Sequence, residues 1–362
     1  MDIPTHTTVL NWTKKQGISK FREVVFYHQQ KWILIADESI QFGNKKLLLV
    51  LAVPELRCEQ GMELSYKDLT PLVLKVSSSW KSEHIASEIQ QYIDLKQISY
   101  CISDTGSNLV HAFKSLNCIH IPDINHKFSL IIKSAFENNC NLDDYTKILS
   151  SLRAKRSMSK IARIVPPNQR IMNRFMNLTP LFEWGVTMIN LLDKNELTEE
   201  EKMELSFLES ESLREFICDS YQILIGLNYV QQIIKSKGYS EKSKKEALSR
   251  FSNIESKNAL KIKRQVALYF EDLSAKAQGK TICCSSDIIE SCFGRYKEIV
   301  KGNKTVGISD LSLCIAAMTG INNLEKTKEA MEMVSIQKMK EWGKKNIAKT
   351  LFAEKIELNK KL

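Results

Sequence analysis

Residues 32–54 read WILIADESIQFGNKKLLLVLAVP, and this stretch decides the fold. Its first part, from Trp32 to Asp37, is a short apolar run that is typical of a buried β-strand. A second apolar run, KKLLLVLAV, follows, and the Gly-Asn pair between the two runs indicates a hairpin. The stretch therefore predicts two antiparallel strands, with the acidic residue Asp37 at the end of the first apolar run.

Further strand and helix patterns extend this sheet. LTPLVLKV (69–76), ISYCISD (98–104) and CIHIPDI (118–124) predict three more strands, and helices are expected over 82–97, over 106–116 and from His126 onward. Consecutive strands can pair antiparallel, whereas strands joined by helices become parallel neighbours. The sequence thus predicts an α/β fold with a mixed five-stranded sheet flanked by helices.

The strand patterns stop at about residue 141, where long helical patterns take over. We expect an all-helical insertion domain over residues 141–280, a return of the sheet-containing part at 281–325, and a C-terminal helical tail at 326–362. Before the sheet, residues 8–15 predict a short basic helix that Gly17 stops.

Charge and cysteine usage restrict the class of partner. The 362 residues carry a net charge of +10, which favours a polyanion, either nucleic acid or an anionic membrane surface. No run approaches the roughly 18 apolar residues of a membrane-spanning helix, and no secretory signal is visible. Nine scattered cysteines without a C-x2-C pair predict reduced thiols in a cytoplasm, not a disulfide framework or a zinc site.

Three carboxylates are candidates for one site. Asp37 and Asp104 each end an apolar strand, and Glu290 lies in SSDIIESCFGRYKE, which indicates a helix start. A carboxylate at the end of a buried strand is costly unless it is hydrogen-bonded, paired or bound to a cation. A right-handed crossover would bring the two strand ends together, so the acids predict a divalent-metal site. Asp104 could instead cap a turn, and Asp287 is an alternative third ligand.

Five segments together resemble a known family. They are IADESIQFGNKKLLLVLAV, CISDTGSNL, IPDINHKFSLIIK, VPPNQRIMNRFMNL and SSDIIESCFGRYKE, in this order between about residues 32 and 300. This series resembles the bacterial DDE transposases, whose RNase H-like core carries a helical insertion before the third carboxylate. The resemblance implies an RNase H-like catalytic core over 24–140 and 281–325, and a remnant of an N-terminal DNA-binding region over 1–23.

The resemblance also implies an activity. A DNA transposase cleaves DNA and transfers strands without a protein nucleophile. Asp37, Asp104 and Glu290 would be the catalytic residues and would hold two Mg²⁺ ions, for which Mn²⁺ can substitute. The implied partners are transposon ends and target DNA, with no membrane, and the protein would act as a homodimer in the bacterial cytoplasm, at the nucleoid. A catalytically idle or domesticated DNA-binding protein, or a nuclease that cuts without joining, are the alternatives.

Two further residues match family patterns near the acids. Asp123 and His126 fit a (Cys or Asp)-x2-His signature, and the resemblance implies that His126 contacts the scissile phosphate or orients a metal ligand. Lys297 follows Glu290 by seven residues, an E-x6-K spacing in which the lysine meets DNA. A satisfied buried histidine and a solvated lysine are the alternatives.

A basic run within the expected helical domain predicts a DNA-binding surface. Between Tyr145 and Phe182 no Asp or Glu interrupts the basic residues, and neutralising phosphates gives affinity with little sequence information. A solvated helix face is the alternative. The run consists of Lys147, Arg153, Lys155, Arg156, Lys160, Arg163, Arg170 and Arg174.

Overall fold

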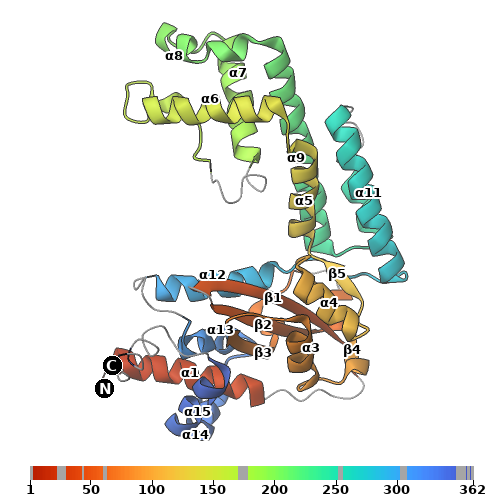
Figure 1. The fold of residues 1–362 in the computed structure, drawn as a ribbon, viewed down its shortest axis with the longest axis vertical. Helices are drawn as coiled ribbons and strands as arrows, with labels where there is room; N and C mark the ends of the chain where they lie inside the picture. Colours follow the sequence, from red (N-terminus) through yellow and green to blue (C-terminus); the bar gives the residue numbers. More distant parts are fainter. Residues whose placement is uncertain are drawn as a thin grey trace. The chain divides into compact units, whose positions relative to one another are not determined.

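The chain folds into two compact units (Figure 1). The first contains Met1–Asp123, Lys235–Tyr239 and Lys280–Leu362, and the second contains Ile124–Ile234 and Ser240–Gly279. The structure, a computed structural model, describes residues 3–22, 30–42, 45–59, 63–169, 178–251, 256–301, 308–347, 356 and 359.

The first unit is built on a five-stranded mixed sheet with the order β3-β2-β1-β4-β5. The strands are β1 Trp32–Phe42, β2 Lys45–Pro54, β3 Thr70–Ser77, β4 Ile98–Ser103 and β5 His120–Pro122. β1 pairs antiparallel with β2, and β2 with β3, whereas β1–β4 and β4–β5 are parallel. The predicted mixed sheet flanked by helices is confirmed.

Side-chain alternation along β1 assigns its residues to two faces. Leu34 and Ala36 belong to a buried cluster that includes side chains of α3 (Ser82–Gln90) and α4 (Ser107–Ser115). The intervening positions, among them Ile35 and Asp37, therefore face the other side. Helix α12 (Asp287–Val300) packs against β1 without contributing to that cluster (Figure 1). Burial on both faces explains why β1 begins as an uninterrupted apolar run.

The remaining described elements of the first unit are short connections and terminal helices. The expected helix over 82–97 is divided, because α3 ends at Gln90 and a 3-10 turn, η2, follows. These elements are α1 His6–Arg22, α2 Glu55–Glu59, η1 Tyr66–Asp68, η2 Leu95–Gln97, η6 Asp310–Ser312, α13 Leu313–Met318, α14 Leu324–Met333 and α15 Ile336–Asn346.

Helix α1 continues past Gly17, so the expectation that this glycine stops the helix is wrong. α1 packs against α13, α14 and α15, and a Cβ atom at Gly17 would clash with the backbone carbonyl oxygen of Leu313. Glycine is needed here because two backbones approach closely, not because the helix ends. Lys14 also forms an ion pair with Asp310 at 2.9 Å, so part of the basic character of α1 is used within the fold.

The second unit contains helices and no strand among its described residues. Phe182 is at the centre of its aromatic core, with ring centroids 5.6 Å from both Tyr145 and Phe216. Helix α5, expected with the sheet, belongs to this unit, whereas the last residues of α9 belong to the first. The elements are α5 Ile124–Phe136, α6 Cys140–Arg156, η3 Ala162–Ile164, α7 Thr179–Asp193, α8 Glu199–Glu204, η5 Ser206–Glu209, α9 Glu211–Lys237, α10 Glu241–Phe251 and α11 Lys257–Ala277.

Candidate functional site

Asp37 and Asp104 lie just beyond the last residue pair of two adjacent parallel strands. β1 continues to Phe42, so the expectation that Asp37 ends its strand is wrong, whereas Asp104 directly follows β4. β1 and β4 pair in register up to Ile35 and Ile102, and each aspartate follows two residues later. Asp37 also pairs with Leu49 of β2, so its backbone is held from the other side. The register therefore places the two residues at the same level, where the pairing of β1 with β4 stops, and alternation puts Asp37 on the face that α12 covers.

The charges of two other acids act on Asp37. Burial and, after it, the negative charges of Asp104 and Glu290 together raise the pKa of Asp37 from 3.8 to about 7. Neighbouring like charges disfavour ionisation only when they are close. The other two acids selected from the sequence thus lie within electrostatic reach of Asp37, although the three come from β1, from the end of β4 and from α12.

Asp104 has a local structural role as well. Its Oδ1 accepts a hydrogen bond from the backbone N–H of Gly106 at 2.9 Å, which holds the turn that leads into α4. The turn-cap alternative is therefore real, and it engages one carboxylate oxygen. A ligand role and a turn role are compatible, because a carboxylate has two oxygens and about four acceptor positions.

The environment of α12 favours Glu290 over Asp287 as the third acid. Asp287 forms an ion pair with Lys235 at 2.7 Å. Partial desolvation raises the pKa of Glu290, followed by the charges of Asp287 and Asp123, although the residue as a whole is exposed. The charge of Glu290 also contributes to the raised pKa of Asp37, which favours Glu290 as the third acid.

Hydrogen bonds from distant parts of the chain hold the start of α12. Oδ1 of Asp123, a buried residue after β5, accepts the backbone N–H of Ser286 at 2.7 Å. The hydroxyl of Tyr100 on β4 accepts the backbone N–H of Cys283 at 2.9 Å. Sequence reasoning placed Asp123 only in a motif and missed these contacts, because no local pattern signals a partner more than a hundred residues away.

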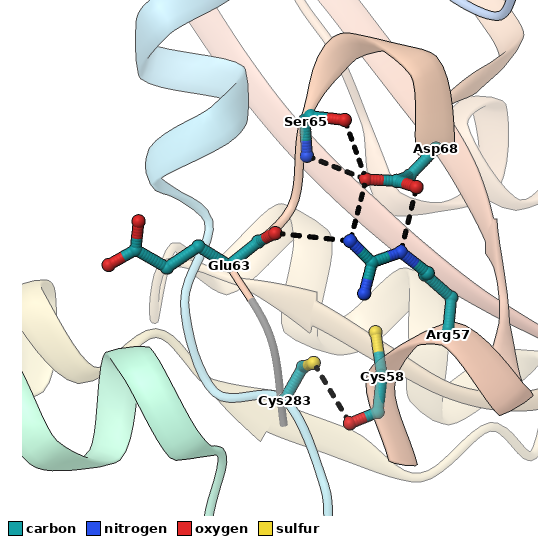
Figure 2. A network of polar contacts seen from close by, with 6 residues as sticks. All are labelled: Arg57, Cys58, Glu63, Ser65, Asp68 and Cys283. Carbon is teal, nitrogen blue, oxygen red and sulfur yellow. Dashed lines mark hydrogen bonds and ion pairs between the residues drawn. The ribbon is translucent and has the colours of Figure 1, made fainter. Parts of the chain in front are cut away.

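A polar network of α2 and η1 lies beside the segment before α12 (Figure 2). Arg57 donates from Nε to Asp68 at 2.8 Å, and Asp68 accepts the backbone N–H of Ser65 at 2.8 Å. The Sγ atom of Cys283 lies 3.9 Å from the carbonyl oxygen of Cys58. The neighbouring segment and the first turns of α12 enclose a pocket of about 270 Å³, lined by Glu63, Leu64, Lys235, Cys283, Cys284, Ser285, Asp287, Ile288 and Ser291.

Lys297 and His126 lie in different units. Lys297 is exposed on α12, and its positive charge partly offsets the rise in the pKa of Glu290, as does that of Lys235. His126 is half-buried on α5 in the second unit. Within the first unit, Lys235 and Lys297 thus both place positive charge within electrostatic reach of Glu290.

The basic run is less positive in the fold than in the sequence. Arg163 forms a double hydrogen bond with Glu201 at 2.6 and 2.7 Å, and Arg156 pairs with Glu204. Both acids belong to α8, about forty residues further along the chain. Arg153 donates to the carbonyl oxygen of Pro166 at 2.6 Å. Lys147, Lys155 and Lys160 are exposed, and Arg170 and Arg174 lie outside the described residues.

The three acids are neighbours that do not form a finished coordination shell. In the part of the chain that the structure describes, no group of three or more His, Cys, Asp or Glu residues is arranged to hold a metal ion. The chemistry of the donors nevertheless suits a hard cation, because carboxylate oxygens are preferred ligands of Mg²⁺ and Mn²⁺. A divalent cation would also offset the mutual repulsion that contributes to the raised pKa of Asp37.

Comparison with known proteins identifies no relative. No protein-family model matches the chain, and no curated protein is similar to it in sequence. None of the helices in the described ranges is long and apolar enough to cross a membrane. The function is therefore argued from the site.

Proposed function

We propose that this protein is a DNA transposase with an RNase H-like catalytic core, in which Asp37, Asp104 and Glu290 form the catalytic site. The observation that supports it most is the placement of two aspartates where the parallel pairing of β1 and β4 stops, with an acid on a helix that packs on β1. Such a convergence of carboxylates suits metal-dependent cleavage at phosphorus. In this proposal the helical second unit is the insertion between the second and third acids.

The proposed chemistry assigns a task to each acid. Bound at these carboxylates, Mg²⁺ or Mn²⁺ would supply charge neutralisation at the phosphodiester and activation of a water or DNA 3′-hydroxyl. Asp37 must lose its proton to act as a ligand, and its pKa of about 7 makes this loss incomplete at neutral pH. Metal affinity should therefore rise with pH through that range, because a ligand has to be deprotonated.

DNA is the proposed partner, as transposon ends and as target. Lys297 supplies a positive charge beside Glu290, and Lys155 and Lys160 are exposed cations of the second unit. Such residues bind phosphates and confer little sequence preference. A homodimer on DNA and a location in the bacterial cytoplasm, at the nucleoid, belong to the same proposal and rest on the family resemblance alone.

The alternatives are an idle DNA-binding protein and a nuclease that cuts without joining. The three functions differ in their products. An active transposase joins DNA ends, a nuclease only cuts, and an idle protein binds DNA without changing it.

The test uses the full chain with labelled DNA taken from either side of its coding sequence, a supercoiled plasmid as target, and Mg²⁺ or Mn²⁺, with EDTA as a blank. We expect joined products. Cut products without joining would support the nuclease, and uncut but bound DNA would support the idle protein.

Asparagine at position 104 gives the sharpest variant for this assay. Asp104→Asn removes the charge and keeps an acceptor for Gly106, so the turn into α4 should survive while cleavage is abolished. Glu38→Gln is the matched control, since Glu38 pairs with Lys46 at 3.3 Å and should not be needed. Asp287→Asn tests the alternative third ligand, and we expect it to retain activity that Glu290→Gln loses.

A further inference from the structure

Asp123 bridges the two elements that carry Asp104 and Glu290. It follows β5 directly and is only 2% exposed. Its backbone N–H donates to the carbonyl oxygen of Ser103, the residue before Asp104, at 2.8 Å. Its side chain accepts the backbone N–H of Ser286, which lies one helical turn before Glu290, at 2.7 Å. One buried residue is thus hydrogen-bonded to the end of β4 and to the start of α12.

The start of α12 needs such an acceptor. The first N–H groups of a helix have no partner within the helix, and a buried N–H without a partner costs about 1–3 kcal/mol. The Ser286 side chain makes no capping hydrogen bond, and Ser286 is itself buried, so water does not replace one. A carboxylate at a helix N-terminus is also favoured by the helix dipole. The Asp123 side chain therefore fixes where α12 begins.

We propose that Asp123 is a positioning residue, which holds α12 so that Glu290 faces Asp37 and Asp104. Its consequence for catalysis rests on the proposed function, whereas the hydrogen-bonded link is a property of the fold. The role requires an acceptor oxygen at this position and does not require a negative charge. This separates Asp123 from the three acids, whose charge is essential in the proposed site.

Two substitutions distinguish these roles. Asp123→Asn keeps a carbonyl oxygen that can accept the Ser286 N–H, and Asp123→Ala removes the acceptor. If Asp123 positions α12, asparagine should preserve the helix start and alanine should release it. If Asp123 instead acted as an anionic ligand, asparagine and alanine would be equally harmful to activity without a matching change at Ser286.

Hydrogen–deuterium exchange of the full chain, followed in the peptide around Ser286, tests the link without any activity assay. We expect at least about tenfold faster exchange in Asp123→Ala and close to wild-type exchange in Asp123→Asn. Tyr66→Phe is the control. It removes the 2.6 Å hydrogen bond from the Tyr66 hydroxyl to the hydroxyl of Ser291, a residue of α12, and leaves the hydrogen bond of Ser286 intact. Wild-type exchange in Asp123→Ala would overturn the inference.

Cleavage kinetics then connect the link to the site. We expect Asp123→Ala to lower kcat with little change in KM for DNA, and Asp123→Asn to recover most of kcat. Equal loss in both variants, with normal exchange in Asp123→Asn, would overturn the inference. If wild-type protein does not cleave DNA while the exchange results hold, the proposed function fails and the positioning role stands.

If Asp123→Ala does not fold, the test uses Asp123→Asn alone, and the NMR resonance of the Ser286 amide proton is measured. A hydrogen bond to a charged carboxylate is stronger than one to a neutral amide oxygen. The Ser286 amide resonance should therefore shift upfield in Asp123→Asn while its exchange protection remains. An unchanged resonance would overturn the inference.

Discussion

Replacing Asp37 by asparagine should stabilise the protein above pH 7 and change its stability little near pH 4. The pKa of Asp37 is about 7 in the folded protein, against 3.8 for an ordinary aspartate. Between these values the folded state binds more protons than the unfolded state, so the free energy of unfolding falls as the pH rises. The contribution of Asp37 is fully present below pH 3.8 and is lost as the pH rises through 7.

The size of the effect follows from the same two values. They differ by about 3 pH units, which corresponds to about 4 kcal/mol at about 1.4 kcal/mol per unit. Asp37 is only half-buried, so solvent screening lowers the expected gain to about 2–4 kcal/mol at about pH 8.5. Asparagine cannot ionise, so the variant avoids both the desolvation of the charge and its repulsion by Asp104 and Glu290.

Urea unfolding in the presence of EDTA, followed by tryptophan fluorescence, measures this difference. Four of the five tryptophans, Trp12, Trp32, Trp80 and Trp342, belong to the first unit, so the signal reports mainly on the part that contains Asp37. If the free energy of unfolding falls with urea concentration at the same slope in both proteins, both expose the same amount of surface on unfolding. Glu329→Gln, on an exposed position of α14, controls for the loss of one negative charge.

Two results would refute the reasoning. The first is that Asp37→Asn does not raise the free energy of unfolding at about pH 8.5, which would mean that the Asp37 carboxylate is not destabilising. The second is that Asp37→Asn raises the free energy of unfolding equally at about pH 4.5, which would mean that the effect comes from packing and not from ionisation.

Millimolar Mg²⁺ should stabilise the wild type at high pH, because a bound cation offsets the repulsion among the acids. The difference in unfolding free energy between the wild type and Asp37→Asn should therefore become smaller.

Three further predictions concern other parts of the fold. Gly17→Ala should destabilise the protein in thermal melts, because overpacking costs about 1–3 kcal/mol and the gain in helix propensity is about 1 kcal/mol or less; a raised Tm would contradict the close approach of the backbones. A hydrogen bond from Arg163 is the main cause that lowers the pKa of Glu201 to about 2, so Glu201 stabilises the fold above pH 4.5 and this stabilisation is lost as the pH falls through 2. Arg163→Gln should therefore move the midpoint of acid unfolding, measured by circular dichroism, to higher pH. An unchanged midpoint would mean that the ion pair is not formed in solution. In the double variant Lys155→Glu and Lys160→Glu, the slope of log K for DNA binding against the logarithm of the salt concentration should become shallower by about 2, measured by fluorescence anisotropy. An unchanged slope would mean that neither lysine contacts phosphate.

The sheet was predictable because its information is local. The apolar runs of β1 and β2 predict two buried strands by their length and composition, and the structure pairs them antiparallel; the Gly-Asn pair expected at the turn lies outside the described residues. The apolar runs of β1 and β4 also place Asp37 and Asp104 at the same level of the sheet without any knowledge of the rest of the chain, although β1 continues past Asp37. Glu290 needed a family resemblance as well, since a helical acid has no strand end to locate it.

The features that could not be predicted depend on residues far apart in the chain. From the sequence alone Gly17 indicates the end of a helix, whereas in the structure it allows the close approach of the Leu313 backbone. Arg163 looks like part of a pure basic run until Glu201 pairs with it. Sequence patterns give the charge of a segment, whereas only the fold gives the charge that remains after ion pairs have formed.

The packing of α1 on α13, α14 and α15 has a consequence for synthesis on the ribosome. Helix α1 emerges long before α13, α14 and α15, so Ile18 and Phe21 cannot be covered by Leu313, Val334 and Met339 until those helices have been made. The helices of the second unit, by contrast, have all emerged once α11 is complete. Contacts between segments far apart in a chain form late, and apolar surface exposed meanwhile favours aggregation. A nascent chain can therefore complete its second unit before its first, and the apolar face of α1 stays uncovered until α13, α14 and α15 have emerged.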